Sequence, residues 1–277
     1  MAISAAEVKK LKDMTNAGMM DCKKALEDAS GDMDKALKIL KEKGLADAKK
    51  RTDRETKEGG VFIKQKDNKL SMILLGCETD FVSGNEIFKT VKDKILDAVI
   101  KEGKEDASVY NDLVQEIVSQ TKENVELKKV KFISLKDNQI AQTYIHGNNK
   151  IGVAAIFEVN KPELKSNKDF IEMATDVCLH ITAQNPFYLN ESDVPAADIE
   201  EQKALFTKQM EGSGKPANVL ENIFKGKIAK FLSEICLVSQ AFVKDDKISV
   251  TQYVQNASKK LGAEIKIVAY YRYMIGA

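Results

Sequence analysis

Residues that commonly carry catalysis or hold metals are few in this chain and lie far apart. The sequence has two histidines, His146 and His180, and four cysteines, none of them in a Cys-x-x-Cys pair. A zinc site needs closely spaced cysteine and histidine ligands, and a nucleophilic triad needs a histidine base. Neither of the two common glycine-rich phosphate-loop motifs occurs in the sequence. We therefore expect no catalytic residue, no metal site and no cofactor, and predict that the chain is not an enzyme.

The two histidines suit other roles. His180 lies on the apolar face of a predicted helix over 170–184, where a core histidine held by hydrogen bonds is favoured over a general base. His146 begins the turn His146-Gly-Asn-Asn149, where a surface contact with a partner and ordinary turn chemistry both fit the pattern.

Met19 and Met20 form the first of two stretches that suit binding to another protein. They follow Gly18 at the start of a predicted helix, and both cannot face the core of a small bundle. Flexible methionine at an exposed helix start is a common binding anchor. The alternative, that both side chains fill gaps inside the bundle, fits the pattern equally well.

The second stretch, Cys77-Glu-Thr-Asp-Phe-Val-Ser-Gly-Asn85, directly follows a predicted apolar strand. It places Phe81 beside Asp80 where a polar turn is expected. One aromatic side chain that enters a partner's pocket can supply much of the binding free energy. We interpret Phe81 as such an anchor on a loop; the alternative is that it packs beneath the following helix.

Composition limits the kind of protein in which these residues lie. The 277 residues include 43 Lys and Arg against 42 Asp and Glu, for a formal net charge of +1. Nucleic-acid binding usually needs a surplus of basic residues, so no direct nucleic acid is expected. At about 150 residues per domain, the length favours roughly two domains. No membrane span or signal peptide is recognised, and we expect a cytoplasmic protein with reduced, mostly buried thiols.

The fold class predicted from the pattern is α+β. Residues 1–44 indicate a three-helix domain of the ubiquitin-associated (UBA) type, with Ser4 as the first cap, Ser30-Gly31-Asp32 between the last two helices and Gly44 as the stop. Residues 45–59 are highly charged and are predicted to be a linker, or a helix extension that frays into one.

The remainder indicates a duplicated core. Two β-hairpins with Asp/Asn/Gly turns, at 61–76 and 142–158, each lead to an amphipathic helix, and a further strand over 125–135 precedes the second copy. We predict a core N-subdomain at 60–139 and a core C-subdomain at 140–190 and 237–277, each with a small antiparallel sheet. Residues 191–236 are predicted to be an inserted helical coiled-coil hairpin, broken at Gly212–Pro216, and residues 263–273 a last strand.

A family resemblance adds to this interpretation. Six segments follow, in order and spacing, the pattern of the translation elongation factor Ts (EF-Ts) family: Thr15–Leu26, Cys77–Val82, His146–Val153, Leu179–Pro186, Ser213–Pro216 and Ser239–Val243. The resemblance implies a guanine-nucleotide exchange factor for the GTPase EF-Tu, which it would bind in the GDP-bound and nucleotide-free states, and it leaves open a higher-order EF-Tu/EF-Ts assembly.

The resemblance also implies residue roles. In the family, the Thr-Asp-Phe-Val segment enters the GTPase near its magnesium and phosphate site. Phe81 would wedge between helices of the GTPase, Asp80 would help to displace groups that hold Mg²⁺, and Thr79 and Val82 would frame them. Met19 and Met20 would dock on the same GTPase domain, and the region of His146 would meet another domain of EF-Tu.

The sequence departs from the family pattern at a few positions. Asn16 stands where glycine is usual, and Ser83-Gly84 replaces a small residue followed by a basic one, which could weaken a loop contact beyond Phe81. The chain stops at Gly276-Ala277, so the contacts of the C-terminal extension that some members carry are not expected. Two rival classes, a nucleic-acid-binding module and a small-molecule enzyme, are opposed by the even charge and by the missing catalytic constellation.

Overall fold

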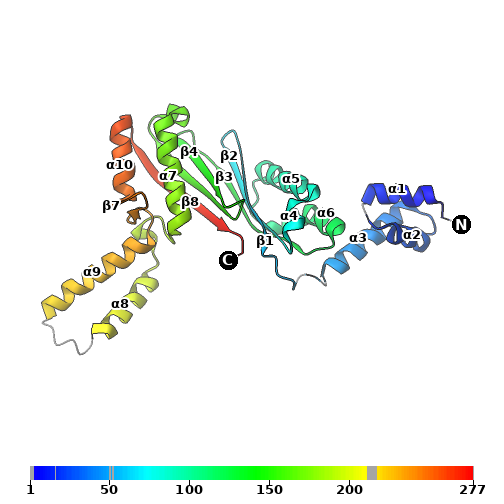
Figure 1. Cartoon of the computed structure of the whole chain (residues 1–277), viewed down its shortest axis with the longest axis horizontal. Helices are drawn as coiled ribbons and strands as arrows, with labels where there is room; N and C mark the ends of the chain where they lie inside the picture. Colours follow the sequence, from blue (N-terminus) through cyan, green and yellow to red (C-terminus); the bar gives the residue numbers. More distant parts are fainter. Residues whose placement is uncertain (1–2, 16, 50, 52, 211–216, 277) are drawn as a thin grey trace. The chain divides into compact units, whose positions relative to one another are not determined.

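The computed structural model describes residues 3–15, 17–49, 51, 53–210 and 217–276. The chain folds into two compact units, shown with their helices and strands in Figure 1. Unit 1 comprises Met1–Ser134, Gly147–Ile151 and Tyr273–Ala277; unit 2 comprises Leu135–His146 and Gly152–Arg272. Helices and small sheets occur together in the described residues, so the α+β class is confirmed.

Unit 1 begins with three helices, α1 (Ala5–Thr15), α2 (Met19–Asp28) and α3 (Met33–Lys49). Ser4 caps α1 as predicted: its hydroxyl accepts from Glu7 N–H at 3.2 Å, and the Glu7 carboxylate accepts from Ser4 N–H at 2.8 Å. Gly31, with φ +86°, allows the tight turn from α2 to α3, because a residue with a Cβ avoids this conformation. Apolar side chains that include Leu11, Cys22 and Leu26 form the core of this bundle.

The predicted stop of the third helix at Gly44 is wrong, because α3 continues to Lys49. Glycine inside a helix costs about 1 kcal/mol relative to alanine, which good helix formers on both sides can offset. Lys41-Glu-Lys43 precedes Gly44 and Leu45-Ala-Asp-Ala-Lys49 follows it, without a proline. The segment predicted as a linker therefore begins as helix, and its last two residues already belong to strand β1. Asn16, predicted to lie in the turn before α2, falls outside the described residues.

A sheet of order β1-β2-β3 forms the rest of unit 1: β1 (Glu58–Lys66), β2 (Lys69–Cys77) and β3 (Val125–Ser134), antiparallel throughout. The chain between β2 and β3 forms α4 (Asp80–Gly84), α5 (Glu86–Glu102), the 3₁₀ turn η1 (Ala107–Tyr110) and α6 (Asn111–Thr121). Figure 1 shows α5 and α6 side by side, and their apolar faces share one core with the sheet. The central strand β2 is buried over most of its length, so it provides a rigid base for the residues that follow Cys77.

Unit 2 is built on a second sheet of order β4-β5-β8, formed by β4 (Gln139–His146), β5 (Ile151–Val159) and β8 (Ile265–Met274). The 3₁₀ turn η2 (Pro162–Ser166) leads to α7 (Lys168–Gln184), whose Phe170 packs edge-on against Phe157 of β5 at 5.6 Å between ring centroids. Helix α10 (Val250–Leu261) packs on α7, next to the short pair β6 (Ala241–Phe242) and β7 (Asp245–Ser249). The strands predicted for both hairpins, and the last strand, are thus present.

Two helices, α8 (Ala196–Met210) and α9 (Ala217–Ile235), follow the 3₁₀ turn η3 (Glu191–Asp193) and contact each other. Lys227 of α9 lies over the Phe206 ring at 5.0 Å and donates to Gln209 Oε1 at 2.8 Å. The predicted break at Gly212–Pro216 lies outside the described residues. A coiled-coil geometry for this pair stays a prediction.

Candidate partner-binding site

Phe81 is the most exposed large apolar side chain among the described residues, with 85% of its surface accessible. Strand β2 ends at Cys77, and residues Asp80–Gly84 form the single helical turn α4. The predicted loop is therefore wrong in detail. Thr79 has the N-cap position, where its hydroxyl accepts from Val82 N–H, so the chain closes a helical turn as soon as the strand ends.

Val82, the next residue, is only 6% exposed and belongs to the core of unit 1. Consecutive residues of a helix point about 100° apart, so burial of Val82 turns Phe81 outward. The alternative in which Phe81 packs beneath the following helix is wrong. Asp80 is exposed beside Phe81, so an acidic and an aromatic side chain emerge together from an anchored turn.

Two carboxylates hold this turn against the α6–β3 connection, and sequence reasoning missed both. Glu123 accepts from Thr79 N–H at 3.0 Å and from the Thr79 hydroxyl at 2.7 Å. Glu78 accepts from Asn124 N–H at 2.6 Å and from the Arg54 guanidinium at 3.3 Å. The partners are 44 residues apart for Thr79 and Glu123, and no local pattern in the sequence links them.

Met19 and Met20 lie in the first turn of α2, where 51% and 76% of their surfaces are exposed. Cys22, Ala25 and Leu26 occupy the buried face of the same helix. The alternative in which both methionines fill gaps inside the bundle is therefore wrong. Asp21, directly after them, is tied to α3 by the Lys43 ammonium at 2.6 Å, which lowers the pKa of this carboxyl.

His146 and His180 have very different surroundings, both within unit 2. His146 is exposed at the end of β4, with its Nδ1 3.1 Å from the Tyr144 hydroxyl oxygen. His180 is completely buried: its Nδ1 accepts from Val243 N–H at 3.1 Å, and its Nε2 lies 2.9 Å from Gln240 Oε1. Burial lowers the pKa of His180. The prediction of a core histidine held by hydrogen bonds is confirmed.

The residues predicted for binding thus fall into separate places. Thr79, Asp80, Phe81 and Val82 share one turn of unit 1, Met19 and Met20 share one turn of α2, and His146 belongs to unit 2. In the described ranges, no group of histidine, cysteine or acidic side chains is arranged to hold a metal ion. Burial raises the pKa of the Cys77 and Cys178 thiols to about 12, so both are protonated at neutral pH.

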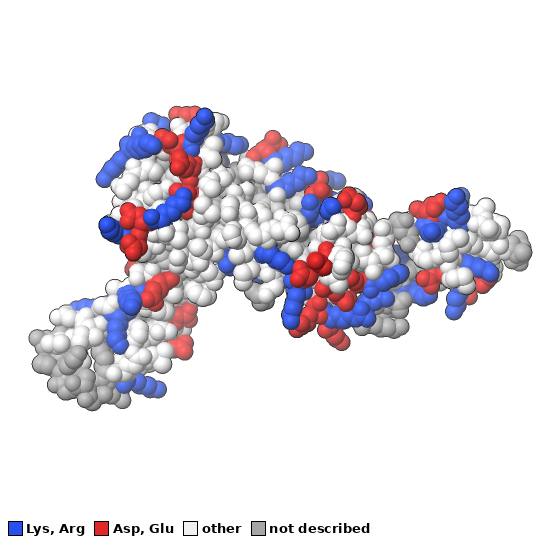
Figure 2. Space-filling view, in the orientation of Figure 1, with Lys and Arg blue, Asp and Glu red and all other residues white. Residues whose placement is uncertain are grey.

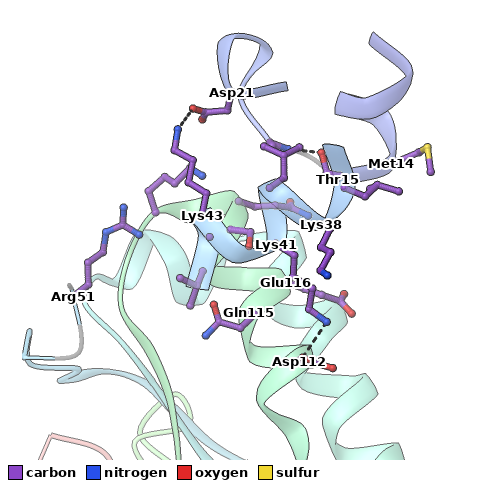
Figure 3. Close-up of a pocket in the computed structure, with 18 residues that line it drawn as sticks. Met14, Thr15, Asp21, Lys38, Lys41, Lys43, Arg51, Asp112, Gln115 and Glu116 are labelled. Atoms are coloured by element: carbon purple, nitrogen blue, oxygen red, sulfur yellow. Dashed lines mark hydrogen bonds and ion pairs between the residues drawn. The ribbon is translucent and has the colours of Figure 1, made fainter. Parts of the chain in front are cut away.

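A cavity of about 700 Å³ in unit 1 lies between α3 and α6 and contains none of the predicted binding residues. Figure 3 shows its mixed charges, with Lys43 reaching Asp21 and Lys41 beside Asp112. The wider surface has the same character: in Figure 2, basic and acidic side chains are interspersed over the face that is drawn. No helix in the described residues is long and apolar enough to cross a membrane.

Comparison with known proteins assigns the chain to a class. The family model described as "Elongation factor TS" matches residues 78–277, which begin at the turn that presents Phe81. This match defines a factor of translation elongation. Proteins named elongation factor Ts from Nitratiruptor sp. and Treponema denticola are each 40% identical to the chain, covering all of it and 94% and 99% of their own lengths. One from Borreliella burgdorferi is 39% identical and covers 99% of both chains. The chain belongs to the elongation factor Ts family.

Proposed function

We propose that this chain is a guanine-nucleotide exchange factor for EF-Tu and speeds GDP release by disturbing the Mg²⁺ and phosphate site of that GTPase. The observation that carries the proposal is the exposure of Phe81 on a turn that is held by the buried Val82 and by the hydrogen bonds of Thr79. An exposed aromatic side chain costs solubility and contributes nothing to the core, so its rigid presentation supports a role in binding.

We assign a role to each side chain of the turn according to whether it is exposed or already engaged within the chain. Phe81 enters a pocket between helices of the GTPase, and the Asp80 carboxylate beside it repels and displaces groups that hold Mg²⁺. Val82 faces the core and Thr79 is occupied by hydrogen bonds within the chain. We therefore propose that these two residues hold the turn in shape rather than touch the metal's ligands.

Two further contacts complete the proposed interface. Met19 and Met20 dock on the same domain of the GTPase. Both side chains are exposed and flexible, so they can adapt to the surface of EF-Tu in its GDP-bound and nucleotide-free states. The surface around His146 meets another domain of EF-Tu. The proposal has three further parts. The N-terminal bundle is a UBA-like domain, and the protein acts in the cytoplasm. The two factors can also form a higher-order EF-Tu/EF-Ts assembly.

The mechanism requires no bond-making chemistry from the chain. A partner that binds the nucleotide-free GTPase better than the GDP-bound form must weaken GDP binding by the same factor. Removal of the contacts that neutralise the diphosphate speeds its release, after which GTP binds and displaces the factor. EF-Tu then carries GTP and is again active in protein synthesis.

Release of a fluorescent GDP analogue from EF-Tu, with catalytic amounts of the chain, tests this function. We expect the wild type to accelerate release, and Phe81→Ala to reduce the acceleration by a factor of about 30 or more, the usual effect of removing an aromatic binding anchor. Because Phe81 is 85% exposed, the variant should remain folded. No acceleration by the wild type would overturn the proposal.

A further inference from the structure

Glu123 lies in the short connection between α6 and β3 and uses both carboxylate oxygens on one residue of the Phe81 turn. Its Oε2 accepts from Thr79 N–H at 3.0 Å, and its Oε1 accepts from the Thr79 hydroxyl at 2.7 Å. Hydrogen bonds to an ionised acceptor are about twice as strong as neutral ones. Glu123 is half-buried, which protects these bonds from competition by water.

The bond from the Thr79 hydroxyl orients the cap of α4. A hydroxyl has one hydrogen to donate and two lone pairs with which to accept. Because Glu123 takes the hydrogen, a lone pair of the Thr79 oxygen is directed to Val82 N–H, which lies at 3.4 Å. The carboxylate therefore acts through Thr79 on the backbone that carries Phe81.

A second carboxylate, that of Glu78, links the same two segments of the chain next to the Thr79–Glu123 pair. Glu78 accepts from Asn124 N–H at 2.6 Å, and Asn124 Nδ2 in turn donates to Arg54 O at 2.8 Å. Residues 78 and 79 are thus paired with residues 124 and 123. Helix α4 has only five residues, and a single helical turn is unstable without outside contacts. Its geometry depends on these pairs and on the burial of Val82.

We infer that Glu123 is a positioning residue for nucleotide exchange: its two hydrogen bonds to Thr79 hold the turn that presents Phe81 and Asp80. This inference rests on the proposed function, since the reaction it serves is exchange on EF-Tu. Glu123 does not itself touch the GTPase or the nucleotide. Its loss lets the turn sample other conformations, so that Phe81 must be ordered again whenever the partner binds.

Glu123→Gln tests the inference with the least change in shape. The amide oxygen can still accept from Thr79 N–H, but the NH₂ group can only donate to the Thr79 hydroxyl, so both bonds lose their charged acceptor and the hydroxyl hydrogen loses its partner. We expect GDP release at subsaturating amounts of the factor to slow about tenfold, as for loss of a bond to a charged group. Thr79→Val, which removes the hydroxyl, should slow release similarly, and the double variant should be little worse than either single one. Thr79→Ser, which keeps the hydroxyl, should stay near the wild type.

Glu126→Gln is the matched control for charge. Glu126 lies three residues further along the chain, is exposed, and accepts from Thr56 rather than from Thr79. Its substitution removes the same negative charge from the same region and should leave exchange within about twofold of the wild type.

Amide hydrogen exchange on the same variants gives a readout that loss of global stability would not produce. Glu123→Gln should speed exchange at Val82 and Ser83, whose amides donate to the Thr79 hydroxyl and carbonyl oxygens, and leave the amides of strand β2 unchanged. Slower GDP release together with this local loosening supports the inference. It is overturned if Glu123→Gln releases GDP as fast as the wild type, if Glu126→Gln slows release equally, or if β2 loosens as well. Absence of any wild-type acceleration instead overturns the proposed function.

Discussion

Phe81 and Val82 are neighbours in the chain, yet 85% of the first side chain is exposed and 6% of the second. Their side chains point about 100° apart within a single helical turn, which Thr79 caps. The same five-residue helix thus contributes one side chain to the core and offers another to a partner. Binding and folding can therefore be changed independently at adjacent positions.

Val82→Ala should lower the free energy of unfolding by about 2 kcal/mol, because two buried methyl groups are lost from the core. Phe81→Ala should change it by less than about 0.5 kcal/mol, as is usual for exposed positions. Urea denaturation of the two variants and the wild type measures both changes. Equal destabilisation by the two substitutions would contradict the opposite orientations of these side chains.

Met19→Ala and Met20→Ala together should weaken binding to EF-Tu roughly tenfold and leave unfolding almost unchanged, since both side chains are exposed. Met33→Ala is the matched control. Its side chain is partly buried against the core of the bundle, so this substitution should lower stability without a direct effect on affinity. Affinity by titration calorimetry and the melting temperature separate the two effects, and unchanged affinity in the double variant would remove these methionines from the interface.

Stability should fall as the solution becomes acidic because of His180. Burial lowers the pKa of this imidazole below its ordinary value of 6.5, so the unfolded chain binds the proton more readily than the folded one. The contribution of the neutral His180 side chain to the free energy of unfolding is fully present above pH 6.5. It is lost as the pH falls toward the lowered pKa of the folded state. The slope from one such group is at most about 1.4 kcal/mol per pH unit.

Urea denaturation between pH 7.5 and pH 5 measures this slope. His180→Gln should be less stable at neutral pH, because Val243 N–H loses its acceptor, but should show a shallower pH dependence. An identical slope in the variant would assign the acid sensitivity to other groups.

The thiols of Cys77 and Cys178 should resist alkylation in the folded protein. Burial raises the pKa of each to about 12, and only the thiolate attacks iodoacetamide. At pH 8 both should react at rates limited by unfolding, and rapidly once urea is added. Peptide mass spectrometry after timed labelling identifies the modified residues, and fast labelling of either in the native chain would show that its site opens.

Local signals in the sequence predicted the local structure well. Ser4 and Asp32 cap helices as their types suggest, because a cap depends only on the next few residues. Hairpin turns rich in Asp, Asn and Gly join strands of alternating pattern for the same reason. Gly44 is the counterexample: its helix continues because the flanking residues favour helix more than glycine opposes it.

The candidate site was only partly predictable. The types of Met19, Met20 and Phe81 suggested anchors, but whether each side chain pointed in or out depended on packing that no short pattern records. Glu123 could not be found from the sequence, because the fold alone brings it to Thr79 from 44 residues away. The sequence therefore indicated the residues proposed to contact a partner more readily than the residues that hold them in position.

The order of strands in unit 2 has a consequence for synthesis of the chain itself. Strand β8 follows α10 in the described residues and lies next to β5, which the ribosome releases before α7, α8, α9 and α10. Until β8 arrives, one edge of β5 has no strand to pair with, and an open edge invites pairing with other chains. The nascent second unit must therefore wait with an incomplete sheet, while the strands and helices of the first sheet, contiguous in sequence, can already fold.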